Sequence, residues 1–133
     1  MIQLADSLNK FSFETLKKTN PENNLENTIF SPYSAFVCVS MSAPLFQEQT
    51  RTEILRSLQI PVEGSQNFDG FLHQLRALIE KENTDKVSTS NRIWANQNLN
   101  FNPKTFSLNK DILGIPIETT DFPQPGCDKI NKE

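Results

Sequence analysis

The chain has a single histidine, His73, among its 133 residues, and only four glycines and two cysteines. A Ser–His–Asp arrangement would have to use His73, which falls in the middle of a predicted amphipathic helix with ordinary neighbours, so a solvated side chain is the favoured interpretation. No two candidate ligands stand at metal-ligand spacing, and the scattered glycines cannot build a phosphate-binding loop. These absences predict a protein that is not an enzyme and that binds no metal and no cofactor.

The sequence also has little net charge and no long hydrophobic run. A net charge of −3 without a basic cluster gives no reason to expect binding to nucleic acid. The first six residues contain no basic segment followed by an apolar one, so we expect no signal peptide. No stretch is apolar for long enough to cross a bilayer, and we expect no membrane partner.

Residues 27–43 carry no charge at all, and the rest of the chain is organised around them. Ser31 can cap a helix through its hydroxyl, and Pro32 suits the first helical position. The residues that follow are apolar or small on every side, which predicts a buried central helix. Cys38 lies within it, so a free buried thiol is favoured over a disulfide with Cys127.

The flanking segments predict further helices and two strands within a single domain. Apolar residues at helical spacing predict helices over 2–19 and 68–81, and Asn102-Pro103 opens another that ends near Gly114. Thr50 and Glu53 form a capping box for a short helix that stops before Pro61. Two segments have the composition of strands, 87–94 and 115–122, and a last helix begins near 128. The sequence therefore predicts a helix-rich α+β fold.

Several phrases of the sequence, in order, resemble those of the serpin family. The phrase at 27–35 resembles the start of the family's central helix, and the phrase at 10–16 resembles its first helix. Thr50-Arg51-Thr52-Glu53-Ile54 is similar to its Thr-x-x-Glu/Gln-Ile, and Ser90-Asn91-Arg92-Ile93-Trp94 to its Ala-Asn-Arg-Leu-Phe/Trp. The phrases at 117–122 and 129–132 resemble Val-Glu-x-Val-Asp-Phe and Ile-Asn-Lys/x-Trp. The resemblance covers nearly the whole chain, but only the N-terminal third of a serpin.

This resemblance implies an α+β fold with about five helices around the buried central helix, plus two strands of the family's large sheet. Residues 1–133 would form a partial serpin domain of the intracellular, ovalbumin-like type, without the reactive loop and the C-terminal sheets. By family resemblance the protein is a serine-type or cysteine endopeptidase inhibitor, but this chain has no reactive bond and is expected not to inhibit by itself. A cytoplasmic location is expected, with the extracellular space as the alternative.

The resemblance also implies a conformational site beneath the large sheet. Asn27, Ser31 and Ser34 would belong to a hydrogen-bonded patch where two strands of that sheet part, although Ser31 is equally well explained as a helix cap. The family's Gly-Ala-x-Gly is replaced here by residues 45–48, Leu-Phe-Gln-Glu. This replacement removes two glycines that give easy access to positive φ.

Two alternatives to a protease inhibitor remain open. The chain could be a non-inhibitory interaction protein that binds a complementary serpin segment or a second copy of itself, or a gene fragment with no activity. The motivation is the central helix, since a missing sheet is expected to cover Phe36, Val37, Val39 and Met41. Arg76 and Lys81 lie among acidic residues, so no heparin site is expected.

Overall fold

The computed structural model describes residues 4–19, 29–61, 66–82, 84, 86, 88–100, 102–122 and 124–131. It confirms the α+β class, with several helices and one two-stranded sheet in the described chain. The elements, in chain order, are α1 (Leu4–Thr19), α2 (Pro32–Ser42), the 3₁₀ turn η1 (Ala43–Leu45), α3 (Glu48–Ser57), α4 (Gln66–Glu82), β1 (Ile93–Asn96), α5 (Pro103–Ser107), the π-helical segment η2 (Leu108–Leu113), β2 (Ile117–Thr120) and α6 (Gln124–Ile130).

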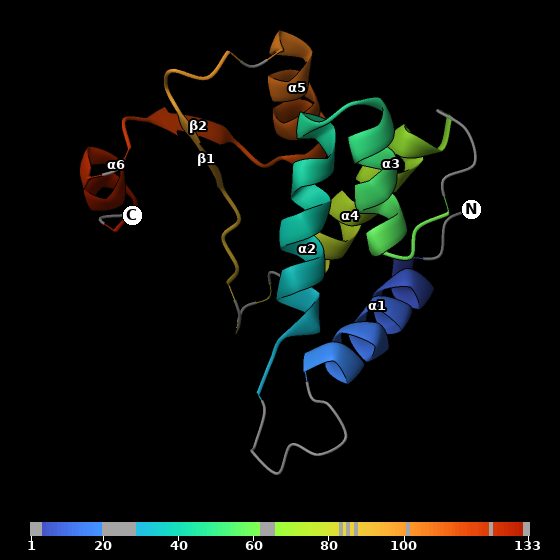
Figure 1. The fold of residues 1–133 in the computed structure, drawn as a ribbon. Helices are drawn as coiled ribbons and strands as arrows, with labels where there is room; N and C mark the ends of the chain where they lie inside the picture. The colour runs from blue at the N-terminus through green and yellow to red at the C-terminus, as the bar shows by residue number, and fades with distance from the viewer. Residues whose placement is uncertain are drawn as a thin grey trace.

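The helix α2 lies at the centre of a helical body and contacts α1, α3 and α4, as Figure 1 shows. The two strands and α6 lie to one side of this body, with α6 at the far end of the sheet (Figure 1). Helix α5 and η2 form a continuous helical stretch that connects β1 to β2 in the sequence, and η2 packs on α4. The molecule therefore has two parts, which we call the helical body (α1–α4, α5 and η2) and the sheet arm (β1, β2 and α6).

One face of α2 forms the centre of the hydrophobic core. Phe36 is fully buried, and its ring meets Phe11 of α1 edge-on at a centroid distance of 5.7 Å. A continuous cluster of buried apolar residues surrounds it. These are Leu4, Val37, Met41, Ala43, Leu55, Leu58, Ile60, Phe71, Leu72, Leu75, Ile79, Leu113 and Ile115.

Two expectations for α2 are wrong. Cys38 is not a core thiol, because it lies exposed on the side of the helix opposite the core, and both cysteines are free and exposed. No missing sheet is needed to cover Phe36, Val37 and Met41, because the chain's own helices bury them. Val39 is half-buried. The helix has apolar or small residues all round, but the described residues cover only one side of it.

The helix α3 begins earlier than the capping-box pattern predicts. Its N-cap is Gln47 rather than Thr50, which lies inside the helix. Glu53 accepts a hydrogen bond from Gln49 Nε2 at 2.9 Å, and Arg51 Nε donates to the Phe46 carbonyl at 2.8 Å. Glu48 enters the helix at a φ of +46°, at the position where the family phrase has its second glycine. Glu48 therefore adopts a left-handed φ that is strained for a residue with a side chain.

The end of α3 is a Schellman motif without its usual glycine. Ile60 N donates to the Leu55 carbonyl and Gln59 N to the Arg56 carbonyl, both at 2.9 Å. Gln59 occupies the left-handed position with a φ of +59°. The buried Ser7 of α1 donates its hydroxyl to the Gln59 carbonyl at 2.9 Å, so this turn joins α3 to α1.

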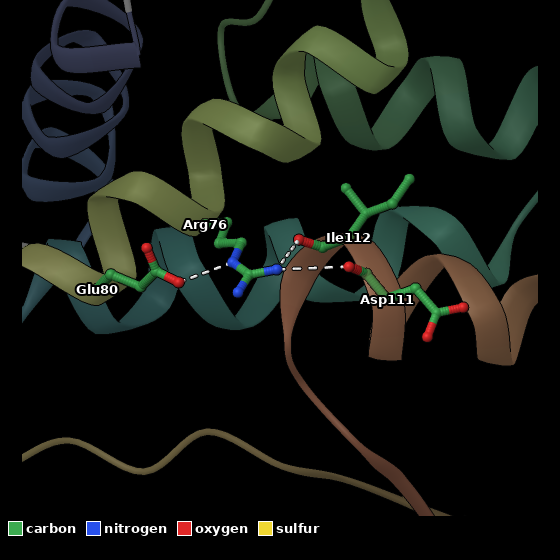
Figure 2. A network of polar contacts seen from close by, with 4 residues as sticks. All are labelled: Arg76, Glu80, Asp111 and Ile112. Atoms are coloured by element: carbon green, nitrogen blue, oxygen red, sulfur yellow. Dashed lines mark hydrogen bonds and ion pairs between the residues drawn. The ribbon is translucent and has the colours of Figure 1, made fainter.

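Arg76 joins α4 to the end of η2. Figure 2 shows its guanidinium between Glu80 and two backbone carbonyls. Nε bonds to Glu80 Oε1 at 2.7 Å, and Nη1 donates to the carbonyls of Asp111 and Ile112 at 3.4 Å each. Gly114 then ends the segment with a φ of +69°, which confirms the predicted cap position. A cation at these carbonyls also complements the negative end of the helical segment.

The two strands pair in parallel, with Ile93 opposite Ile117 and Trp94 opposite Glu118. The composition predicts the first strand over 87–94, but β1 begins at Ile93 and extends to Asn96. It starts there because its ladder begins where Ile93 N donates to the Pro116 carbonyl at 3.3 Å. Pro116 has no N–H to donate, and it precedes β2 as expected.

Candidate functional site

The start of α2 brings two of the predicted site residues together. Ser31 is the N-cap, with extended backbone at φ −102° and ψ 97°, and its Oγ accepts a hydrogen bond from Ser34 N at 3.3 Å. The hydroxyls of Ser31 and Ser34 also lie 3.0 Å apart, within hydrogen-bonding distance. The cap and Pro32 at the start of the helix confirm the predicted helix start. Asn27, the third predicted site residue, lies outside the described residues.

The exposed side of α2 is built from small side chains. We call it the small-residue face, and it comprises Ser31, Ser34, Ala35, Cys38 and Ser42. Ser31, Ser34 and Cys38 are exposed, while Ala35 and Ser42 are half-buried. Ser42 Oγ donates to the Val39 carbonyl at 2.6 Å. A face of this kind offers hydroxyl groups and a close approach to the helix, and it carries no charge.

Among the described residues, neither outer edge of the sheet is paired with another strand. In the part of the chain that the structure describes, the sheet has two strands, so each strand has one neighbour. A strand edge without a neighbour presents backbone N–H and C=O groups to any segment that can pair with them. A further strand could pair with one of these edges, and the small-residue face could lie beneath it.

The sheet also carries a charged cluster that sequence reasoning missed. We call it the sheet-arm cluster, and it comprises Arg92, Trp94, Glu118 and Lys129. Arg92 Nη1 bonds to Glu118 Oε1 at 3.0 Å, and Lys129 Nζ lies 3.5 Å from Glu118 Oε2. Lys129 Nζ also lies 4.8 Å from the centroid of the Trp94 ring. The hydrogen bond from Arg92, helped by the charges of Arg92 and Lys129, holds the pKa of Glu118 below its ordinary value.

One signal of the sheet-arm cluster was present in the sequence. Arg92 and Trp94 are two residues apart in a predicted strand, so their side chains share a face. Glu118 joins them only because the parallel register sets Trp94 opposite it. That register depends on tertiary structure, which explains why the sequence did not predict the cluster.

The described residues contain no group of three or more His, Cys, Asp or Glu side chains that could hold a metal ion. His73 lies exposed on α4, on the solvated side that the sequence predicts. Among the helices described, none is long and apolar enough to cross a membrane.

The fold is that of serpin structures. Ovalbumin from emu (Dromaius novaehollandiae) superposes with a TM-score of 0.72 over 96% of this chain and 36% of its own, at 19% identity. Serpin48 from the insect Tenebrio molitor gives a TM-score of 0.71 over 98% of this chain and 35% of its own, at 18% identity. At such low identity these likenesses establish the fold alone.

The chain belongs to the serpin family, because the family model described as Serpin (serine protease inhibitor) matches residues 6–133. It is similar to an uncharacterized serpin-like protein of Thermococcus kodakarensis, with 27% identity over 86% of this chain and 25% of the relative. It is also similar to Serpin A3-3 of Bos taurus, with 26% identity over 95% of this chain and 31% of the relative. The leukocyte elastase inhibitor of Xenopus tropicalis is 26% identical over 92% of this chain and 32% of its own length. The chain therefore spans about a third or less of the curated relatives it matches.

Proposed function

We propose that residues 1–133 are the N-terminal part of a serpin-type inhibitor of serine or cysteine endopeptidases, and that they do not inhibit a protease by themselves. The observation that carries this proposal is the small-residue face of α2, which faces solvent although the helix has no charged residue on any side. A neutral, closely approachable face on a core helix is suited to a covering layer. Two of the relatives carry inhibitor activity in their names, the leukocyte elastase inhibitor and the alpha-1-antiproteinase of Callosciurus caniceps.

In this proposal the Ser31–Ser34 pair belongs to a patch beneath the large sheet, together with Asn27. Its hydroxyls bond to each other and to the backbone of the first turn, so they are held in place before a strand arrives. Buried hydroxyls need partners, so a covering strand that supplies them would be favoured over one that does not. The patch would thereby help to set which sheet arrangement is stable.

The absence of inhibition is tested by mixing the 133-residue chain with a panel of serine and cysteine proteases. We expect no SDS-stable complex and no loss of protease activity, because the inhibitory reaction needs residues of a serpin fold beyond these. A covalent complex on a denaturing gel would contradict the proposal.

The covering of α2 is tested through Cys38, whose thiol is exposed in this chain. In a Cys127→Ser variant only Cys38 can react with a chromogenic disulfide reagent, and a Cys38→Ser variant reports Cys127 alone. We expect Cys38 to react freely in the isolated chain and to be protected after refolding with the C-terminal two thirds of a related serpin, whereas Cys127 should not change in parallel. Unchanged reactivity of Cys38 on stable complex formation would show that the segment binds elsewhere.

A second function, association with another chain, is favoured by apolar side chains at the surface. Phe13 and Leu16 of α1 are 66% and 44% exposed, and Ile29 before α2 is fully exposed. Exposed apolar side chains of this size mark interaction surfaces when they gather. Size-exclusion chromatography with light scattering separates the alternatives, because a clean monomer at all concentrations would argue against self-association.

We also propose that the chain binds no heparin-like polyanion. Arg76 is the best-placed cation of α4, but its guanidinium is already shared between Glu80 and two backbone carbonyls. Lys81 is adjacent to Glu80 and Glu82, whose charges oppose its own. Retention on an immobilised heparin column at physiological salt would contradict this expectation.

A further inference from the structure

Helix α6 buries little apolar surface through those of its side chains that the structure describes. It packs against β2, and its described side chains Cys127, Asp128 and Lys129 are exposed while Ile130 is only half-buried. Figure 1 shows α6 at the end of the sheet arm, away from the helical body. Segments with few buried apolar contacts open at low free energy, well before the whole protein unfolds.

Lys129 contributes a contact to each strand beneath α6. Its Nζ lies 3.5 Å from Glu118 Oε2 on β2 and 4.8 Å from the ring centroid of Trp94 on β1. Trp94 and Glu118 are partners in the parallel register, so one ammonium group bridges the pair. Arg92 holds the other carboxylate oxygen of Glu118 at 3.0 Å, which leaves Oε2 directed toward Lys129.

We propose that Lys129 is a salt-sensitive latch that holds α6 on the sheet, so that α6 docks and departs as a unit while the helical body stays folded. The ion pair is partly exposed, with side-chain exposures of 47% for Lys129 and 30% for Glu118. Salt screens such pairs, since the Debye length falls from about 10 Å at 0.1 M to about 3 Å at 1 M. The cation–π contact with Trp94 is lost when the ammonium leaves, so both contacts weaken together.

The latch can be observed directly because Trp94 is the only tryptophan of the chain. In the wild-type chain at low salt, we expect the docked α6 to shield Trp94 from acrylamide, and about 1 M NaCl to raise the quenching. In Lys129→Met the quenching should be high at both salt concentrations. Amide hydrogen exchange at Asn131, whose N–H bonds to the Cys127 carbonyl at 3.0 Å, should be about fivefold faster in Lys129→Met.

Two further variants control for side effects of the substitution. Glu118→Gln keeps the shape of the side chain and removes its charge, so it should reproduce the loss of salt response. Lys10→Met removes an exposed lysine from α1 and should leave Trp94 quenching as in the wild type. Amides of α4 should keep their wild-type exchange rates in every variant.

Three outcomes would overturn the proposal. The first is equal Trp94 quenching in wild type and Lys129→Met at low salt, the result also expected if α6 never docks. The second is a salt response that persists in Lys129→Met. The third is faster exchange in α4 together with α6, because the variant would then have loosened the whole fold. None of these outcomes depends on protease inhibition, so the latch and the proposed function are tested separately.

Discussion

The helical body and the sheet arm are held together by different forces. In the helical body, α2, α3 and α4 bury large apolar side chains against one another, and several of these, among them Phe36, Leu58, Leu72 and Leu75, have no exposed surface. In the sheet arm, a short parallel ladder and a cluster of charged and aromatic side chains prevail, with Trp94 and Glu118 both half-buried. Its apolar contribution is smaller, since Ala95 is buried and Ile93 is only half-buried where it packs against the core of the helical body. The comparison teaches that the contacts that determine global stability lie mainly in the helical body, whereas the contacts that respond to salt and pH lie in the sheet arm.

This difference has a physical cause. Burial of a large apolar side chain contributes about 1.5–3 kcal/mol and does not respond to moderate salt or pH. Exposed ion pairs contribute about 0–1 kcal/mol and respond to both. We therefore expect substitutions in the helical body to change global stability, and substitutions in the sheet arm to change local docking.

The largest effect should come from the centre of the helical body. Phe36→Ala should lower the free energy of unfolding by about 3–5 kcal/mol, because it removes a fully buried ring and leaves a cavity against Phe11. Urea denaturation measures the change. Cys38→Ala, two residues away on the small-residue face, should change it by less than about 0.5 kcal/mol. If the two variants lost comparable amounts of unfolding free energy, α2 would not be divided into a core face and an uncovered face.

A stabilising change is expected at a polar residue inside the helical body. Asn109 is fully buried in η2, and neither polar atom of its amide has a hydrogen-bond partner among the described residues. Asn109→Ala should raise the free energy of unfolding by about 1 kcal/mol, since an unpaired buried amide is costly and alanine favours helix.

A matched control for Asn109 lies at the start of the same helical stretch. Asn102 is exposed, and its Oδ1 accepts a hydrogen bond from Lys104 N at 3.0 Å. Asn102→Ala should therefore lower the free energy of unfolding by about 1 kcal/mol. If thermal denaturation shows both variants destabilised to the same extent, the Asn109 amide has a partner after all.

A smaller gain is expected where α3 begins. Glu48→Gly should raise the free energy of unfolding by about 0.5–1 kcal/mol, because glycine adopts the φ of +46° without strain. Gln47→Gly is the control, since Gln47 has an ordinary φ of −123° and glycine there should destabilise the protein. Chemical denaturation of both variants decides, and a loss of stability in Glu48→Gly would show that its side chain compensates for the strain.

The smallest effect should be a change of pKa in the sheet arm. The hydrogen bond from Arg92 is the main cause of the lowered pKa of Glu118, so Arg92→Met should return that pKa toward its ordinary value. A lowered pKa in the folded state means that the contacts of Glu118 stabilise the protein above the ordinary glutamate pKa, about 4.3, and are lost as the pH falls through the lowered value. In Arg92→Met this loss should be smaller and should be complete at higher pH, because the folded-state pKa lies closer to the ordinary value.

The Glu118 titration can be followed by NMR of the labelled carboxylate carbon. Arg56→Met, which removes an exposed arginine of α3, should leave the Glu118 titration unchanged. Identical titrations in the wild type and in Arg92→Met would contradict the role of Arg92.

Local signals in the sequence predicted most of the helices. The cap at Ser31, the spacing of Phe71, Leu72 and Leu75, and the glycine after η2 each depend on interactions within a few residues. The same local reasoning misplaced the start of α3, because the Thr50–Glu53 pattern is also compatible with an interior turn of a helix. It also identified residues 45–48 as a place where a positive φ would be difficult, and Glu48 adopts one there.

Only part of the site could be predicted from the sequence. Ser31 and Ser34 lie together because they are three residues apart at a helix start, which the sequence determines. The exposure of Cys38 could not be predicted, since an uncharged helix does not indicate which of its faces the remaining elements will cover. The sheet-arm cluster joins residues 26 apart, Arg92 and Glu118, through a strand register.

The amino-acid sequence by itself determined the helical elements, the uncharged central helix and the family of this protein, because each is encoded in spacing and composition along the chain. Only the tertiary structure decided which side of α2 is buried, which left-handed positions are occupied by Glu48 and Gln59, and how Lys129 reaches two strands at once. The physical reason is that burial, backbone strain and charge pairing depend on neighbours that are distant in sequence. Those neighbours are brought together only when the chain packs.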